Sequence, residues 1–316
     1  MQTGTVVEYH REYCSVELDD QQREVVAKPR GRLELTTRAA EKDAAKLGTL
    51  RFAQQVTVGD RVVLTQPQAD YFVIEEVLPR ETWLIRKSSL HYQHRLQCVV
   101  ANADQLAVVV APAPLVNLNI VDRYFMAAIQ GGLAPILVVN KTDLDPHLPE
   151  SVEMRNYIEL GYSVYFTSAR QGSGICELAA ALGGKLTAFC GHSGVGKSTL
   201  LSALTGVEIK SQELLPGSHL GRQTTSTSRL YHLSAGGTAV DTPGIREFGL
   251  AHLEWLDLHD YFHDIAQLAM RCAYRDCRHT VEPECAVQQA VARGELAAQR
   301  LASFIKLRAE CEQRSY

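Results

Sequence analysis

Over the first ninety residues, hydrophobic and polar positions alternate in short runs separated by turn residues. Asp-Asp, Pro and Gly-Asp sequences bound these runs, as expected for short strands. The strands are predicted at residues 4–9, 13–18, 24–27, 61–64, 71–77 and 82–86. Five or six such strands in so short a segment are typical of a small closed barrel, and we expect an OB-fold.

Two polar stretches of this segment stand apart from the strands. Arg30, Gly31 and Arg32 suggest a basic rim on the barrel, the alternative being a solvated loop with scattered arginines. Residues 36–48 are interpreted as a polar insertion. The rim would give the barrel a surface for RNA.

From residue 104 the pattern changes to longer apolar runs that alternate with helical periodicity. Residues 104–111 and 136–139 are nearly continuous apolar runs, as in buried strands, and residues 121–130 between them have the spacing of a helix. Alternating strands and helices predict a parallel sheet with right-handed crossovers. Beyond residue 249 the pattern becomes helical, with segments expected at 287–293 and 296–311.

These patterns predict an α/β chain with three domains. They are an OB-fold β-barrel at residues 1–90, an α/β domain at residues 91–250 and a helical domain at residues 251–316. A length of 316 residues and a hydrophobic content of 46% suffice for separate cores. The formal net charge of −4 does not indicate a nucleic-acid-binding protein, so any affinity for RNA must come from local patches.

The cellular compartment is predicted from two features of the sequence. No charged and apolar leader opens it, and no window approaches the roughly 18 apolar residues that cross a bilayer. The chain has 8 cysteines, and only three of them cluster, which favours a metal site over a disulfide framework. We therefore expect a cytoplasmic protein with no membrane partner.

The cysteine cluster lies in the predicted helical domain. Cys272, Cys277 and Cys285 with His279 can form a tetrahedral Cys₃His shell, the arrangement expected of one structural zinc ion. The alternative is a coincidental group of core cysteines. Cys311, farther along the last helix, is interpreted as a lone core or surface thiol.

A glycine-rich segment after the predicted strand 186–190 has the pattern of a phosphate loop. It comprises Gly191, His192, Ser193, Gly194, Val195, Gly196, Lys197 and Ser198, with a helix expected from Ser198 and Thr199 onward. Backbone N–H groups and the helix N-terminus would hold a polyphosphate, Lys197 would reach its outer phosphates and the Ser198 hydroxyl would bind magnesium. A plain turn before a helix is the alternative, but strand, loop and helix coincide here.

Two other loops predict which base is bound. Asn140, Lys141, Thr142 and Asp143 follow the apolar run 135–139 and resemble the loop that recognises guanine in G proteins. The Asp143 carboxylate would accept hydrogen bonds from the guanine ring N–H and amine, a donor pair that adenine lacks. The companion loop that touches the guanine carbonyl is predicted at Ser168 and Ala169.

Two further segments offer groups for the terminal phosphate and its metal ion. Asp241 ends a predicted strand and would hold magnesium through water, while the Gly244 N–H would contact the terminal phosphate. Residues 221–228 lack periodicity, as expected of a loop that the terminal phosphate orders. Thr224 or Thr225 is the candidate magnesium-sensing hydroxyl, a hydroxyl-rich linker being the alternative.

The order of these motifs is unusual. In conventional G proteins the phosphate loop and the Asp-x-x-Gly segment precede the two guanine loops, whereas here the guanine loops come first. This order predicts a circularly permuted P-loop GTPase that binds GTP and GDP, which is possible if the original termini lie close together. The new end falls just after residues 241–244, so the helical domain is attached to the segment that senses the terminal phosphate.

The succession of barrel, permuted GTPase and zinc segment resembles the RsgA group, the bacterial GTPases that depend on the small ribosomal subunit. The likeness covers nearly the whole chain and rests on Arg30 and Gly31, residues 59–62, residues 122–124, residues 140–143, the phosphate loop, Gly221, Arg222, Thr224 and Thr225, residues 241–244 and the zinc spacing. The resemblance implies a late assembly factor that hydrolyses GTP when the small subunit and its rRNA stimulate it. We expect it to act as a monomer.

One position departs from the family pattern. Members of the group typically carry histidine in the Gly-Arg-x-Thr-Thr segment, where this chain has Gln223. In Ras-like proteins a glutamine directly after Asp-x-x-Gly orients the attacking water, and here that place is Ile245. Gln223 is therefore a candidate for positioning water, beside another side chain or ribosomal RNA, the alternative being a solvated loop residue. The candidate catalytic residues are Lys197, Gln223, Thr224, Thr225 and Asp241.

Two other functions fit the same motifs. One is a nucleotide-gated RNA-binding module with negligible turnover, and the other is a permuted GTPase that acts on the large ribosomal subunit. The barrel and the zinc segment favour the small-subunit family over the second. A GTPase assay with and without small subunits separates the enzyme from the binding module.

Overall fold

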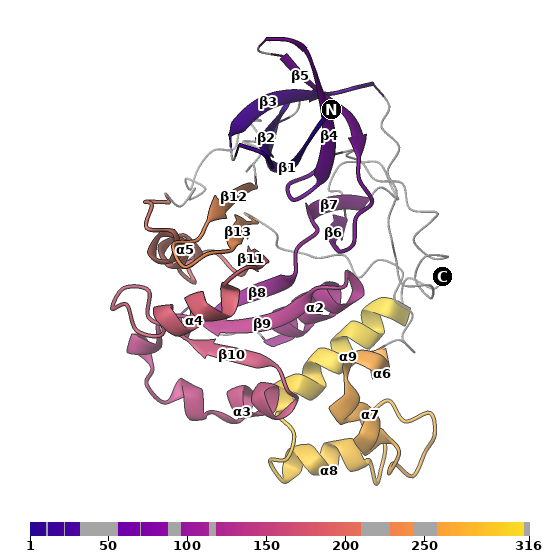
Figure 1. Cartoon of the computed structure of the whole chain (residues 1–316). Coiled ribbons are helices and arrows are strands. Elements are labelled where there is room, and N and C mark those ends of the chain that lie inside the picture. The colour runs from indigo at the N-terminus through magenta and orange to yellow at the C-terminus, as the bar shows by residue number, and fades with distance from the viewer. Residues whose placement is uncertain are drawn as a thin grey trace, which may run out of the picture.

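Figure 1 shows the computed structural model of the chain, with a barrel at one end, a group of helices at the other and a helix-covered sheet between them. The structure describes residues 1–10, 12–21, 23–31, 56–69, 71–87, 96–113, 118–209, 228–242 and 258–312. The predicted polar insertion at 36–48 and Arg32 lie outside these residues. Arg30 is exposed and paired with Glu75, which offsets its charge on the predicted basic rim.

The N-terminal strands close into the predicted OB-like barrel. They are β1 (Gln2–Tyr9), β2 (Cys14–Leu18), β3 (Glu24–Pro29), β4 (Arg61–Gln68) and β5 (Tyr71–Val77). Their order is β1-β2-β3-β5-β4, and β4 returns to pair with β1. Alternate residues of each strand fill the interior of the barrel. In β3, for example, Val25 and Ala27 are buried while Val26 and Lys28 are exposed.

The sixth predicted strand forms but does not join the barrel. β6 (Trp83–Lys87) pairs instead with β7 (Leu96–Ala101) in a separate two-stranded sheet. Leu84 packs in the apolar cluster of the central sheet, which explains why this strand leaves the barrel. Local alternation predicts that a strand exists, but the partner of that strand depends on nonlocal packing.

The central sheet is parallel apart from its last strand, which also pairs with β1 of the barrel. It has the order β10-β9-β8-β11-β13-β12, and β12 pairs with β13 in the antiparallel sense. The strands are β8 (Gln105–Val110), β9 (Ala134–Val139), β10 (Ser163–Phe166), β11 (Leu186–Cys190), β12 (Arg229–His232) and β13 (Thr238–Asp241). This sheet confirms the α/β prediction.

Helices cover both faces of the central sheet. They are α2 (Leu118–Gln130), α3 (Val152–Glu159), α4 (Ile175–Leu182) and α5 (Lys197–Thr205), with 3-10 turns at Thr142–Leu144 and Leu148–Glu150. Successive residues of β8 serve opposite faces, because Leu106 and Val108 pack in the cluster with α2 and α3 while Ala107 and Val109 pack with α4 and α5. A strand buried on both faces reads as the continuous apolar run seen in the sequence.

The C-terminal helices form their own apolar core. They are α6 (Leu258–Tyr261), α7 (His263–Ala269), α8 (Ala286–Ala292) and α9 (Ala298–Glu312), so α8 and α9 match the two helices predicted from residue 287 onward. Phe262 and Phe304 meet edge to face in this core, with ring centroids 5.4 Å apart. Met126 of α2 also packs there and joins the core to the central sheet.

A buried ionic network fixes α9 against α2. The Arg300 guanidinium pairs with Asp122 of α2 and lies 3.0 Å from Asp264 of α7. The Tyr157 hydroxyl donates to Asp122 at 2.7 Å, and Arg300 also stacks over the Phe262 ring at 4.1 Å.

None of the described helices is long and apolar enough to cross a membrane.

Candidate nucleotide and metal sites

The predicted nucleotide loops converge at one edge of the central sheet. The phosphate loop follows β11, residues 140–143 follow β9, residues 168–169 follow β10, and Asp241 ends β13. All four of these strands are parallel, so their carboxyl ends lie at the same edge. Ligands of open α/β sheets bind at this edge.

The phosphate loop has the backbone conformation that its glycines permit. Gly194 and Gly196 have φ angles of 83° and 91°. A Cβ atom at Gly196 would lie 2.5 Å from the Asn140 side-chain nitrogen, so a larger residue does not fit. His192, Ser193, Gly194 and Thr199 are exposed along the loop, whereas Val195 is buried beneath it.

Lys197 begins α5, one residue earlier than the sequence predicted. Its Nζ donates to the backbone carbonyls of Gly191 at 2.7 Å and His192 at 3.1 Å, so the side chain folds back over the loop. Burial lowers the pKa of Lys197, and the nearby Asp241 carboxylate opposes this shift. Ser198 follows in the first turn of α5 and is half-buried.

Asn140 connects three of the loops. Its Nδ2 donates to the Val195 carbonyl of the phosphate loop at 2.9 Å, and its Oδ1 accepts from the Ala169 N–H at 3.1 Å and the Thr167 hydroxyl at 3.2 Å. Lys141 adds a hydrogen bond from Nζ to the Gly194 carbonyl at 2.5 Å. The sequence pointed to these residues as base-reading and did not reveal that they also brace the phosphate loop.

Asp143 and Ser168, which lie in the two predicted base-reading loops, contact each other. The Ser168 hydroxyl donates to Asp143 Oδ1 at 2.5 Å, and the Thr142 N–H donates to the Thr167 carbonyl at 3.1 Å. Ser168 is almost fully buried, so the hydrogen bond from its hydroxyl orients the Asp143 carboxylate from the protein interior. The arrangement leaves a fixed acceptor beside the phosphate loop, the group that a donor pair on a base requires.

Asp241 fits a hydrated magnesium ion. Among the described residues, its Oδ1 atom is buried with no hydrogen-bond partner, an arrangement that costs free energy unless a ligand occupies it. Burial raises the pKa of Asp241, and the positive charge of Lys197 opposes this shift. Gln223, Thr224, Thr225 and Gly244, the other predicted phosphate-side residues, lie outside the described residues.

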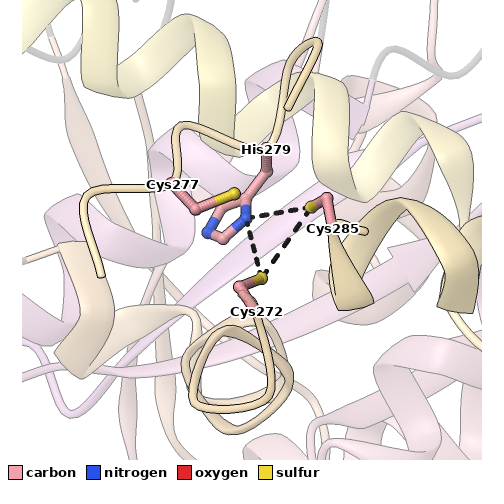
Figure 2. A group of neighbouring side chains, drawn as sticks. All are labelled: Cys272, Cys277, His279 and Cys285. Atoms are coloured by element: carbon pink, nitrogen blue, oxygen red, sulfur yellow. Dashed lines mark hydrogen bonds between the residues drawn. The ribbon is translucent and has the colours of Figure 1, made fainter. Parts of the chain in front are cut away.

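The cysteine cluster converges as the spacing predicted. Figure 2 shows the side chains of Cys272, Cys277, His279 and Cys285 pointing toward one another, and all four ligand atoms lie within 4.8 Å of each other. His279 Nδ1 is 3.3 Å from the Cys285 Sγ and 3.7 Å from the Cys272 Sγ. Three thiols and one imidazole are a donor set for a soft or borderline metal ion. Cys311 is buried in the neighbouring core and is not a member of the cluster.

The protonation of this cluster also suits a metal ion. Burial lowers the pKa of His279, with the charge of Arg308 adding to the effect, so the imidazole is neutral and can donate its lone pair. Burial raises the pKa of the Cys277 thiol to about 12 in the metal-free chain. Metal binding must therefore release thiol protons, and metal affinity falls as the pH falls.

Together, the phosphate loop, the guanine-type loops that precede it in the chain and the doubly covered parallel sheet define a circularly permuted P-loop GTPase. Residues 77–251 match the family model described as RsgA GTPase. The chain belongs to the RsgA GTPase family, whose members hydrolyse GTP.

Relatives and solved structures agree with this assignment. The small ribosomal subunit biogenesis GTPase RsgA of Azotobacter vinelandii is 39% identical over 265 residues, which are 83% of this chain and 76% of that protein. Its counterpart from Pseudomonas putida strain F1 is 40% identical over 267 residues, with the same coverage of 83% and 76%.

Two solved structures resemble the whole chain. YjeQ from Thermotoga maritima superposes with a TM-score of 0.67 at 32% identity, over 98% of each chain. YloQ, described as a circularly permuted GTPase, has a TM-score of 0.63 at 24% identity, over 99% of this chain and 96% of its own, and supports the fold alone. The predicted family resemblance is thus confirmed.

Proposed function

We propose that this protein acts in the assembly of the small ribosomal subunit, where it hydrolyses GTP to GDP and phosphate when the subunit stimulates it. The observation that carries the proposal is the meeting of Asp143, Asn140 and the phosphate loop at one sheet edge. Relatives that are 39–40% identical over 83% of this chain are described as small ribosomal subunit biogenesis GTPases. The small subunit and its rRNA are the proposed partners.

We assign the base-reading role to Asp143, with Asn140, Lys141 and Thr142 holding its loop. The Asp143 carboxylate accepts from the guanine ring N–H and exocyclic amine, and Ser168 keeps it aligned. Ala169 lies beside it through the hydrogen bond that its N–H donates to Asn140. This geometry disfavours adenine, because adenine presents no matching donor pair.

Residues 191–199 form the proposed phosphate site. Their N–H groups cradle the phosphates, and Lys197 exchanges the carbonyls that it now contacts for the outer phosphate oxygens. Ser198 and Asp241 hold magnesium, which neutralises charge on the phosphates when bound. Thr224 or Thr225 and the Gly244 N–H complete the site on the side of the terminal phosphate.

The metal of the Cys-His cluster is proposed to be one structural zinc ion. Four protein ligands, Cys272, Cys277, His279 and Cys285, fill a tetrahedral shell and leave no open position for substrate. Cys285 is also the residue before α8, so the ion ties the loop to a helix. The role of the metal is then to stabilise the helical segment.

The three predicted domains and the compartment are also proposals. The barrel and the C-terminal helices each have an apolar cluster of their own, which supports boundaries near residues 90 and 250. The cysteines of the described residues form no disulfide with one another, as expected in a reducing cytoplasm.

The test of this function is phosphate release from GTP with purified small subunits, large subunits or neither. We expect slow hydrolysis alone and with large subunits, and rapid hydrolysis with small subunits, because the chain lacks the water-orienting glutamine after Asp-x-x-Gly. Lys197→Ala should remove the activity and serves as the control for contaminating enzymes. Negligible hydrolysis under all three conditions would indicate the RNA-binding module. Stimulation by large subunits alone would indicate a GTPase that acts on the large subunit.

Gln223 is proposed to position the attacking water on the subunit. Its amide can accept a hydrogen bond from water and donate one to the phosphate. We expect Gln223→Ala to lower the stimulated rate by roughly 100-fold or more, as losses of catalytic positioning do, with GTP affinity nearly unchanged. Gln223→His should retain or raise the rate.

The control is Gln289→Ala, an exposed glutamine on α8. If Gln223→Ala turns over GTP on the subunit as fast as the parent and the control, the side chain takes no part in hydrolysis. Water positioning then comes from another side chain or from ribosomal RNA.

A further inference from the structure

Arg229 stands where the barrel meets the central sheet. It lies opposite Asp241 in the ladder between β12 and β13 and opposite Glu8 in the ladder between β12 and β1. These three residues therefore form a row across three adjacent strands. The row leads from the proposed magnesium carboxylate to the first strand of the barrel.

Two arginine–carboxylate ion pairs and one histidine–carboxylate contact join β12 to three barrel strands. Arg229 Nη1 donates to the Glu8 carboxylate of β1 at 2.9 Å, and Nη2 donates to Glu24 of β3 at 3.4 Å. At the other end of β12, His232 Nε2 lies 2.7 Å from the Glu17 carboxylate of β2. The side chain of Glu8 is only 14% exposed, so its pair with Arg229 is shielded on one side.

Apolar packing makes this junction stiff. Val7 of β1, Leu230 of β12 and Val240 of β13 are buried in one cluster that belongs to the central sheet. β1 and β12 share only one registered pair among the described residues, so the ionic contacts fix how the strands are aligned. Close-packed side chains transmit a displacement to their neighbours and do not absorb it.

An exposed ion pair usually adds little to stability. The alternative interpretation is that the contacts of Arg229 only hold the two strands together. Arg229 differs because the same residue is in register with Asp241 and with the barrel. We propose that Arg229 is a positioning residue that couples the state of the nucleotide site at Asp241 to the position of the barrel.

Coupling between two binding events is reciprocal. A change of nucleotide at Asp241 alters the edge of the barrel, and RNA binding at the barrel alters the nucleotide site, where hydrolysis takes place. The second half rests on the proposed function, because it takes ribosomal RNA as the partner of the barrel. The first half requires only nucleotide binding.

Amide hydrogen exchange of β1 tests the coupling without ribosomes. The full chain is measured with magnesium and either GDP or a non-hydrolysable GTP analogue. In the parent we expect exchange of residues 2–9 to differ about two- to fivefold between the two nucleotides, the size that an exposed ion pair can supply. Arg229→Ala should abolish the difference.

The matched control is Arg293→Ala, since Arg293 is an exposed arginine paired with Glu295 at 2.7 Å far from the barrel. It should keep the parent difference. The double variant Glu8→Arg with Arg229→Glu keeps an ion pair between positions 8 and 229 with the charges reversed, and should restore the difference in exchange that Arg229→Glu alone removes. Identical exchange with both nucleotides in the parent, or an undiminished difference in Arg229→Ala, overturns the proposal.

A second measurement uses hydrolysis with small subunits. Arg229→Ala should lower the stimulated rate about two- to fivefold. The unstimulated rate and the GTP affinity should stay as in the parent, because the proposed roles give Arg229 no contact with the nucleotide. Stimulation equal to that of the parent overturns the coupling and leaves the proposed function intact. A parent that small subunits fail to stimulate refutes the proposed function, and the exchange experiment then decides the coupling alone.

Discussion

Asp143→Asn is expected to bind GTP roughly 100-fold more weakly or worse, because two hydrogen bonds to a charged acceptor contribute about 1.5–3 kcal/mol each. The carboxylate accepts from two neighbouring donors of guanine, whereas an amide places its own N–H₂ group toward one of them. That donor suits xanthine, which has a carbonyl where guanine has its amine. Affinity for xanthosine triphosphate should therefore rise in the same variant.

Nucleotide titration of the parent and the variant measures both affinities. Asp145→Asn is the matched control, because Asp145 lies two residues farther on and accepts a hydrogen bond from the backbone of His147 at 3.1 Å. It should bind GTP like the parent. Unchanged GTP affinity in Asp143→Asn would show that another group reads the base.

Cys277→Ala should lose zinc and much of the stability of the C-terminal helices. Apparent binding free energies of structural zinc are about 10–16 kcal/mol near neutral pH, and in small sites this energy stabilises the fold. Three remaining ligands hold the ion more weakly, so dialysis should leave well under one zinc ion per chain. The parent treated with a chelator should melt like the variant.

Cys311→Ala separates the loss of metal from the loss of packing. Cys311 is a buried cysteine of the same helical core and is not a ligand, so this variant creates a similar cavity without removing a donor. It should keep its zinc and melt close to the parent temperature. Full zinc content together with unchanged melting in Cys277→Ala would refute a structural metal at this cluster.

Local patterns in the sequence predicted which segments become strands and helices. Apolar and polar residues alternate in residues 24–27 because that strand has one buried face. Residues 104–111 form a continuous apolar run because that strand is buried on both faces. The partners of these strands could not be predicted in the same way. β6 has a strand sequence, yet it pairs with β7 beside the central sheet, because Leu84 packs in a cluster whose other members come from distant parts of the chain.

The candidate site shows the same division. Asp143 and Ser168, which the sequence assigned to two separate base-reading loops, lie together in the structure, because the loops at the ends of parallel strands share an edge. The bracing of the phosphate loop by Asn140 joins residues 55 positions apart, and the pairing of Arg229 with Glu8 joins residues 221 apart. Such contacts depend on the path of the whole chain, so no local pattern indicates them.

The buried pair of Asp122 and Arg300 constrains how this family can diverge. Replacing Arg300 leaves the buried Asp122 without its ionic partner, and replacing Asp122 leaves the buried Arg300 with Asp264 alone; breaking a buried ion pair costs about 3–5 kcal/mol. This loss is a large share of the roughly 5–15 kcal/mol by which folded proteins are stable. Apolar residues at both positions would avoid it, but that route passes through an unstable single substitution. The two positions, 178 residues apart in the chain, are therefore expected to change together during evolution or not at all.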